Sequence, residues 1–184
     1  MPLDVIRRVA IHEAGHVIAM HERGLLASTV GIRSDGGFTN LQKSCQEPLT
    51  TSQVETLLVE LAAGGAAEEV CFGDIALVDA EDKNSDLARS LELVRSYSSN
   101  LCRLSTTELT NEADSTEKTA VRARQFGAGM LLEASKKAHA LIIHRRDDVE
   151  RLAALLVEKR FLTSQDLKEF FADPPAKSEN LEAA

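Results

Sequence analysis

His12, Glu13 and His16 form an H-E-x-x-H motif in the segment from Val9 to Val17. On a helix, two imidazoles four residues apart share one face and can bind one Zn²⁺ through their neutral ring nitrogens. Glu13 would then lie beside the metal, where its carboxylate can take a proton from metal-bound water whose pKa the ion has lowered to about 7. A zinc ion held by two histidines and a neighbouring glutamate base is the minimal set of groups for hydrolysing an amide.

The motif lies within a helical pattern. At about 100° per residue, its three residues fall with other apolar residues into one inward arc, about a third of the circumference wide, whereas Ile11 and Ile18 fall elsewhere. Burying two histidines and a glutamate together without a metal would leave costly unpaired polar groups, so zinc is favoured over ordinary core histidines. The arc comprises Val5, Val9, His12, Glu13, His16 and Met20.

A catalytic zinc site needs a third protein ligand and one open position. His21 is a poor candidate, because it lies on the opposite side of the helix from His12. Asp86 is favoured, since a carboxylate within the apolar arc of a predicted helix needs a partner. An aspartate in a first turn can also simply complement the helix dipole. The carboxylates that stay open as alternatives are Glu68, Glu69 and Asp82.

Residues Ser52 to Glu55 have the form of a capping box that opens a second long helix, which continues to Phe72 and Gly73. Its small residues from 62 to 67 would let another helix approach closely. Glu68 and Glu69 lie at the margins of its inward arc, which is unusual for carboxylates. Either they hydrogen-bond a metal-binding histidine, or they belong to a solvated helix end.

Residues 28–33 and 38–41 are predicted to form a short antiparallel hairpin around the turn at 34–37. An extended peptide could add to the edge of this hairpin near residues 29–33, where main-chain hydrogen bonding tolerates many sequences. Val30 and Ile32 are therefore the candidate substrate-binding residues.

The remaining pattern is almost wholly helical, which predicts a mainly α fold with a small antiparallel β-hairpin after the first helix. We expect a single domain over residues 1–172 and a disordered, proline-broken tail over residues 173–184. Residues 75–85 and 105–116 are predicted loops, and Pro48 ends the hairpin region. The expected helices run from Pro2 or Leu3 to about Arg23, from Asn84 or Ser85 onward, over 118–144, over 147–159 with an N-terminal cap at 147–150, and from near Thr163.

Composition narrows the function classes. The net charge of −8 over 184 residues argues against a nucleic-acid surface. No phosphate-binding G-x-x-x-x-G-K-[ST] loop is present, so we expect no ATP site of that kind in this chain. We also expect no membrane segment and a cytoplasmic location, because no apolar run approaches about 20 residues and the cysteines Cys45, Cys71 and Cys102 show no pairing pattern.

Three ordered segments resemble the peptidase domain of the FtsH family of ATP-dependent zinc metalloproteases. They are HEAGH at 12–16, GGAAEEVCFG at 64–73 and NSDLAR at 84–89. The hairpin around Phe38 and the segment from Leu155 to Leu162 are also similar, so the resemblance covers roughly Asp4 to Phe171. It implies a helical zinc-peptidase domain with a small β element.

Carried over by residue, the resemblance implies one Zn²⁺ held by His12, His16 and Asp86, with Glu13 as general base. The family motif has an arginine where this chain has Gly65, and the segment between Asp74 and Asn84 also departs from the family pattern. Family members usually also carry a membrane anchor and an AAA ATPase module, and we expect neither in this chain. Together these departures put ATP dependence, hexamer formation and processive action in question, while the metal chemistry is unaffected.

The leading hypothesis is a zinc metallopeptidase that cleaves accessible or unfolded polypeptides. A separate ATPase or a homo-oligomer is the expected further partner. The second hypothesis is a non-catalytic adaptor or assembly domain that keeps the metal for stability, and Glu13 counts against it because closed structural sites have no use for a base. A third is zinc-dependent hydrolysis of something other than a peptide.

Overall fold

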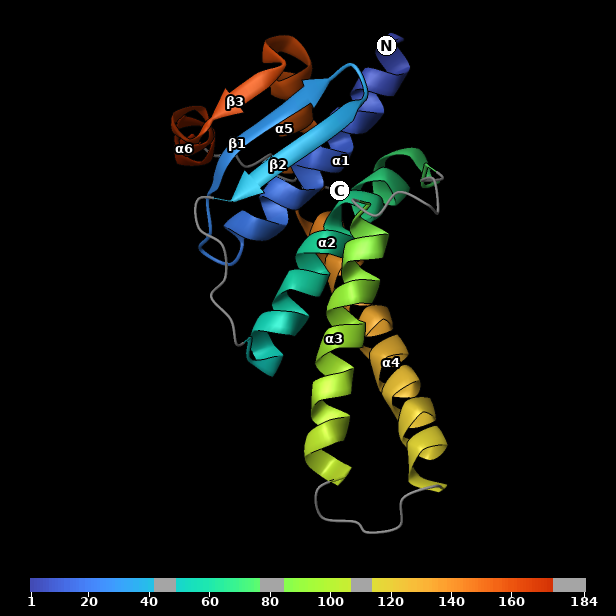
Figure 1. Ribbon diagram of the computed structural model, residues 1–184. Coiled ribbons are helices and arrows are strands. Elements are labelled where there is room, and N and C mark those ends of the chain that lie inside the picture. Colours follow the sequence, from blue (N-terminus) through green and yellow to red (C-terminus); the bar gives the residue numbers. More distant parts are fainter. Residues whose placement is uncertain (42–48, 77–84, 107–113, 174–184) are drawn as a thin grey trace, which may run out of the picture.

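The computed structural model describes residues 1–41, 49–76, 85–106 and 114–173. Six helices and a three-stranded sheet make up this part of the chain, which confirms the prediction of a mainly α fold with a small antiparallel β element (Figure 1). The elements in chain order are α1 (Leu3–His21), β1 (Ala27–Arg33), β2 (Gly36–Leu41), α2 (Thr51–Phe72), α3 (Asp86–Thr106), α4 (Asp114–His144), α5 (Arg146–Lys159), β3 (Phe161–Thr163) and α6 (Ser164–Ala172).

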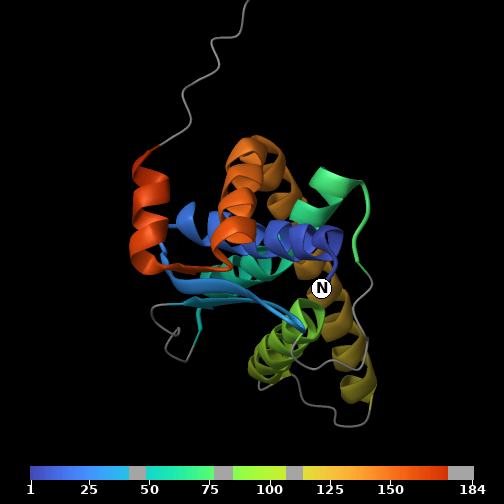
Figure 2. The same ribbon diagram turned by 90° about the horizontal axis from the view of Figure 1, so that it is seen from above.

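Helix α1 is the centre of the molecule. It packs against α2, against α5 and against the sheet, so it is enclosed on most of its sides (Figure 2). The prediction of a single buried arc was wrong for this reason: Ile11 and Ile18 are 2% and 0% exposed, whereas Val5 within the predicted arc is 43% exposed. A helix surrounded by three partners buries several faces, so its apolar residues no longer recur on one face with a clear period of 3.6 residues.

The sheet has the strand order β2-β1-β3, and both pairings are antiparallel. The predicted hairpin is present, but β3 was not predicted. Residues 29–31 of β1 pair with residues 161–163 of β3, so β1 is the central strand. The predicted peptide edge near residues 29–33 is therefore wrong, since β3 occupies it.

Helix α2 begins two residues earlier than predicted. Thr50 is its N-cap and forms a capping box with Gln53, in place of the predicted pair Ser52 and Glu55. Gly73 ends the helix with φ of 80°, in the left-handed region that glycine adopts readily. The prediction of close helix packing holds here, because a Cβ built at Gly15 of α1 would lie 2.5 Å from the carbonyl oxygen of Ala63.

Helices α3 and α4 pair with each other and extend away from the sheet (Figure 1). A second apolar cluster joins them to α2 through Val54, Leu58, Val94 and Ala134. Among the helices in the described ranges, none combines the length and apolar character that a membrane span requires.

Other helix boundaries differ modestly from prediction. Helix α3 reaches Thr106 and α4 begins at Asp114 instead of residue 118, so only residues 107–113 of the predicted loop lie outside the described residues. Helix α5 begins at Arg146 with Arg145 as an N-cap that makes no side-chain capping bond, although Asp147 and Asp148 lie in the first turn. Most of the predicted loop at 75–85, Pro48 and residues 174–184 of the predicted tail also lie outside the described residues.

Candidate metal centre

His12, His16 and Asp86 converge at one point between α1 and the first turn of α3. Oδ2 of Asp86 lies 3.0 Å from Nε2 of His12 and 2.9 Å from Nε2 of His16. The two imidazole rings stand edge to face with centroids 4.8 Å apart. Tetrahedral ligands bound to one zinc at about 2.0–2.2 Å lie roughly 3.3–3.6 Å from each other. The two aspartate–histidine spacings are slightly shorter than this, and all three donor atoms lie within 4.8 Å of one another, so small shifts would let them share an ion.

The opposite ring nitrogens also face acceptors. Nδ1 of His12 lies 2.7 Å from Oε1 of Glu68, and Nδ1 of His16 lies 2.8 Å from the backbone carbonyl oxygen of Glu60. A neutral imidazole carries only one N–H, so two neutral rings cannot donate to acceptors on all four nitrogens. Either protonation of the rings or a metal cation between the two Nε2 atoms and Asp86 removes the conflict; with a metal bound, Nδ1 keeps the proton and Nε2 becomes a ligand. The donor set thus fits a divalent metal.

The electrostatics around these groups strongly favour ionised forms. Burial lowers the pKa of His12, but hydrogen bonds with Asp86 and Glu68 outweigh it and raise the pKa to about 10. Burial would raise the pKa of Asp86, yet its hydrogen bonds with the two histidines hold it well below its usual range. Asp86 is therefore an anion at neutral pH, as a carboxylate ligand must be.

Glu13 lies beside the histidines and is only 6% exposed. Its Oε2 accepts a hydrogen bond of 2.6 Å from the hydroxyl of Thr39 on β2. A Cβ built at Gly37 would lie 2.4 Å from Oε1 of Glu13, so the backbone of β2 passes directly over this carboxylate. The sheet thus covers the glutamate of the motif.

Glu68 is buried, and its carboxylate is hydrogen-bonded to three groups: the imidazole of His12, the guanidinium of Arg8 and the backbone N–H of Ala76. Its Oε2 accepts hydrogen bonds from the Arg8 guanidinium at 3.0 Å and from the backbone N–H of Ala76 at 2.9 Å. Burial would raise the pKa of Glu68, but the bonds from His12, Ala76 and Arg8 lower it below its ordinary value. Arg8 also bonds Asp74 at 2.7 Å, so this arginine of α1 is connected both to Glu68 near the end of α2 and to a residue just beyond that helix.

Glu69 does not share this environment. Its carboxylate is 52% exposed and lies 3.8 Å from Nε2 of His139 on α4. The expectation that Glu69 could contact a metal-binding histidine is therefore wrong, and the other interpretation, a solvated helix end, describes it. One residue step along α2 turns the side chain by about 100°, which separates it from Glu68.

Gly64 of α2 lies against the two candidate ligand atoms. A Cβ built at Gly64 would lie 2.5 Å from Nε2 of His12 and 2.6 Å from Nε2 of His16. The neighbouring Gly65 has room, since its nearest contact would be 3.8 Å from Ile75. Only the first of the two glycines is required by the geometry of the site.

Val30 and Ile32, the predicted substrate-binding residues, do not line an open edge. Val30 is fully buried in the main apolar cluster and pairs with Leu162 of β3, and Ile32 packs against the same cluster. Within the described ranges, β2 pairs with β1 alone. In the part of the chain that the structure describes, β2 is therefore the strand that contacts Glu13 and has no partner on its second edge.

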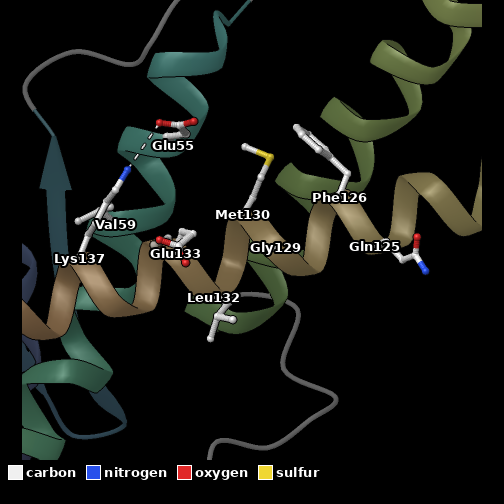
Figure 3. A pocket seen from close by; sticks show the side chains of 10 residues that line it. Glu55, Val59, Gln125, Phe126, Gly129, Met130, Leu132, Glu133 and Lys137 are labelled. Atoms are coloured by element: carbon white, nitrogen blue, oxygen red, sulfur yellow. Dashed lines mark ion pairs between the residues drawn. The ribbon is translucent and has the colours of Figure 1, made fainter.

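A separate groove of about 400 Å³ lies between α2 and α4 (Figure 3). Apolar residues such as Phe126 and Met130 line it, and an ion pair between Glu55 and Lys137 crosses its side. None of the residues that line it belongs to the histidine–aspartate cluster, so this groove has no part in the candidate metal centre.

Sequence reasoning missed four residues that build the site: Arg8, Gly37, Thr39 and Gly64. Gly64 gave one usable hint, since a glycine inside a helix often marks close approach by another group, whereas Gly37 was assigned to the predicted turn at 34–37. Thr39 and Arg8 carried no local signal, because a threonine in a strand and an arginine on a helix are ordinary choices.

Similar proteins were found for most of the chain. It is 28% identical over 176 residues to the ATP-dependent zinc metalloprotease FtsH 2 of Sphaerobacter thermophilus. This matched region covers 91% of this chain and 27% of that protein. It is 27% identical over 196 residues to FtsH 1 of Sorangium cellulosum, with coverage of 94% and 31%. The FtsH of Pseudomonas putida is 31% identical over 182 residues, with coverage of 86% and 29%. The chain thus spans about three tenths of the length of these curated relatives. No protein-family model matches it.

Proposed function

We propose, from its relationship to one segment of the FtsH family of ATP-dependent zinc metalloproteases, that this chain is a zinc-dependent metallopeptidase domain. One observation carries the proposal: the Nε2 atoms of His12 and His16 and a carboxylate oxygen of Asp86 lie within 4.8 Å of one another, where one divalent cation could bind all three. We assign His12, His16 and Asp86 as the ligands of one Zn²⁺ and Glu13 as the general base.

The metal, when bound, supplies a Lewis acid that polarises the scissile carbonyl and makes a coordinated water more acidic. Glu13 accepts the proton of the attacking water and returns it to the leaving amine as the C–N bond breaks. Glu68 and the carbonyl of Glu60 hold the Nδ1 protons, which fixes the tautomer and orientation of each imidazole. Arg8 and the N–H of Ala76 hold Glu68 in turn.

The substrate we propose is an extended polypeptide that pairs with the free edge of β2. Main-chain hydrogen bonds to an edge strand give affinity with little dependence on sequence. β2 also contacts Glu13 through Gly37 and Thr39, so a peptide added there would pass beside the base. Val30 and Ile32 act in this proposal only as the packed support beneath the sheet.

A separate ATPase or further copies of this chain as partners, and a cytoplasmic location, remain part of the proposal. The rival function is a metal-stabilised adaptor without catalysis. The enclosed carboxylate of Glu13, which is not among the clustered donor atoms, favours the peptidase, because a closed structural site would have no use for it.

The test compares cleavage of an unfolded, fluorescently labelled polypeptide by the zinc-loaded wild type, by Glu13→Gln and by wild type treated with a chelator. We expect activity only in the first sample, and the same zinc content in the first two. Equal cleavage by all three samples would refute the peptidase. A fully inactive wild type with one zinc and a fourth protein ligand would favour the adaptor.

A further inference from the structure

Thr39 and Glu13 come from different elements and meet through one short hydrogen bond. The Thr39 hydroxyl on β2 donates to Oε2 of Glu13 on α1 at 2.6 Å. Hydroxyl-to-carboxylate bonds of this length are charge-assisted and stronger than neutral ones. Because Glu13 is almost fully buried, water competes little for the same oxygen.

Gly37 lies two residues earlier on the same strand and therefore on the same face of the sheet. A Cβ there would lie 2.4 Å from Oε1, 2.5 Å from Cγ and 2.7 Å from Cδ of Glu13. The hydroxyl of Thr39 thus hydrogen-bonds Oε2 of Glu13, and the absence of a side chain at Gly37 leaves room for Oε1. Both contacts act on the terminal torsion of Glu13, which is broad and easily rotated when nothing fixes it.

We infer, on the basis of the proposed function, that Thr39 is a positioning residue for the general base. Its hydroxyl holds Oε2 and so orients Oε1 as the oxygen that takes the proton of the attacking water. A base displaced by a rotation of its carboxylate loses much of the advantage of a fixed geometry. The residue acts through Glu13 and does not itself contact the substrate.

The alternative is that Thr39 only stabilises the strand, where it pairs with Val30. Three substitutions separate the two roles. Thr39→Val keeps the shape and the strand propensity but removes the hydroxyl, whereas Thr39→Ser keeps the hydroxyl and lowers the strand propensity. Thr29→Val makes the same exchange on β1 and removes a hydrogen bond from Asn40 instead of the bond to Glu13, so it serves as the control.

In zinc-loaded protein, Thr39→Val is expected to lower kcat for polypeptide cleavage by about tenfold or more, as part of the roughly 10²–10⁴-fold effect of a positioned base. KM and zinc content should stay unchanged, and Thr39→Ser should retain most of the wild-type kcat. In the Glu13→Gln background, Thr39→Val should have no additional effect. A kcat for Thr39→Val equal to that of active wild type would overturn the inference, as would an equal loss in Thr39→Ser.

Crystal structures of zinc-loaded wild type and Thr39→Val give a readout that does not depend on turnover. We expect Oε2 of Glu13 at hydrogen-bond distance from Thr39 in the wild type and a rotated or split carboxylate in the variant. An identical single orientation in both would overturn the inference. If the wild type proves inactive and equal to Glu13→Gln, the proposed function fails separately, and the two crystal structures still decide whether Thr39 orients Glu13.

Discussion

Gly15 and Ala63 lie in direct backbone contact where α1 crosses α2. A Cβ at position 15 would stand 2.5 Å from the Ala63 carbonyl oxygen and 2.7 Å from Cβ of Ala67. Gly15 immediately precedes His16, so this contact sets the distance between the candidate ligands and the helix behind them. The glycine of the HEAGH segment therefore has a packing role distinct from the chemistry of its neighbours.

Gly15→Ala is expected to destabilise the fold by about 1–3 kcal/mol, because the added methyl group meets backbone that cannot move independently. Urea unfolding followed by circular dichroism measures the change. Gly129→Ala is the matched control: it also lies in a helix, but a Cβ there meets nothing within 4 Å, so it should stabilise by about 0.5–1 kcal/mol. A Gly15→Ala protein as stable as wild type would contradict the close packing.

Gly64→Ala and Gly65→Ala should differ sharply in zinc affinity although the residues are adjacent. At position 64 the methyl group would lie within 2.6 Å of Nε2 of both histidines, whereas at position 65 it has ordinary contacts. We expect zinc affinity to fall roughly tenfold or more for the first variant and to stay unchanged for the second. Competition with a chromophoric chelator measures both affinities, and equal values would show that Gly64 does not limit access to the histidines.

Glu68→Gln is expected to weaken zinc binding by about 10–100-fold, since the neutral amide holds the Nδ1 proton of His12 less strongly than a carboxylate. Glu69→Gln is the control, because its side chain is half exposed and paired loosely with His139. The same chelator competition applies. If the two variants bind zinc equally well, the contact between Glu68 and His12 has no influence on the metal.

Asp166 should make stability depend on pH at the start of α6. Hydrogen bonds from Lys159, at 2.6 Å, and from Thr163 hold the pKa of Asp166 below its ordinary value. With a folded pKa below the unfolded value of about 3.9, the stabilisation is fully present above pH 4 and is lost as the pH falls through the folded pKa.

Asp166→Asn should therefore cost about 1 kcal/mol at pH 7, and the difference from wild type should shrink as the pH falls below about 4. Urea unfolding at a series of pH values measures it. A difference that stays constant from pH 7 to pH 3 would show that the carboxylate charge contributes nothing to the cap.

Local spacing alone predicted the elements that depend on local interactions. The four-residue interval between His12 and His16 implies a shared helix face, and the structure brings both rings to Asp86. The aspartate itself lies 70 residues beyond His16. Spacing within one helix cannot show which distant carboxylate lies near the two histidines. The prediction of Asp86 as the third ligand therefore depended on its place in an apolar arc and on the family resemblance.

The predictions were wrong where contacts between residues far apart in the sequence determine the structure. β3 has only three residues, too few for an alternating pattern, and exists because it pairs with β1. That pairing makes Val30 a core residue instead of part of an edge. Glu68 and Glu69 have the same residue type and adjacent positions, and only the packing of α1 and α4 against α2 distinguishes a buried partner of His12 from an exposed neighbour of His139.

The most direct test of the metal centre is an anomalous-scattering map recorded at the zinc absorption edge from crystals of the zinc-loaded protein. We predict one peak per chain, bound by Nε2 of His12, Nε2 of His16 and a carboxylate oxygen of Asp86, with one further position open to solvent. No peak at these three residues, or a peak elsewhere in the chain, would contradict the proposed zinc site and the hydrolysis that depends on it.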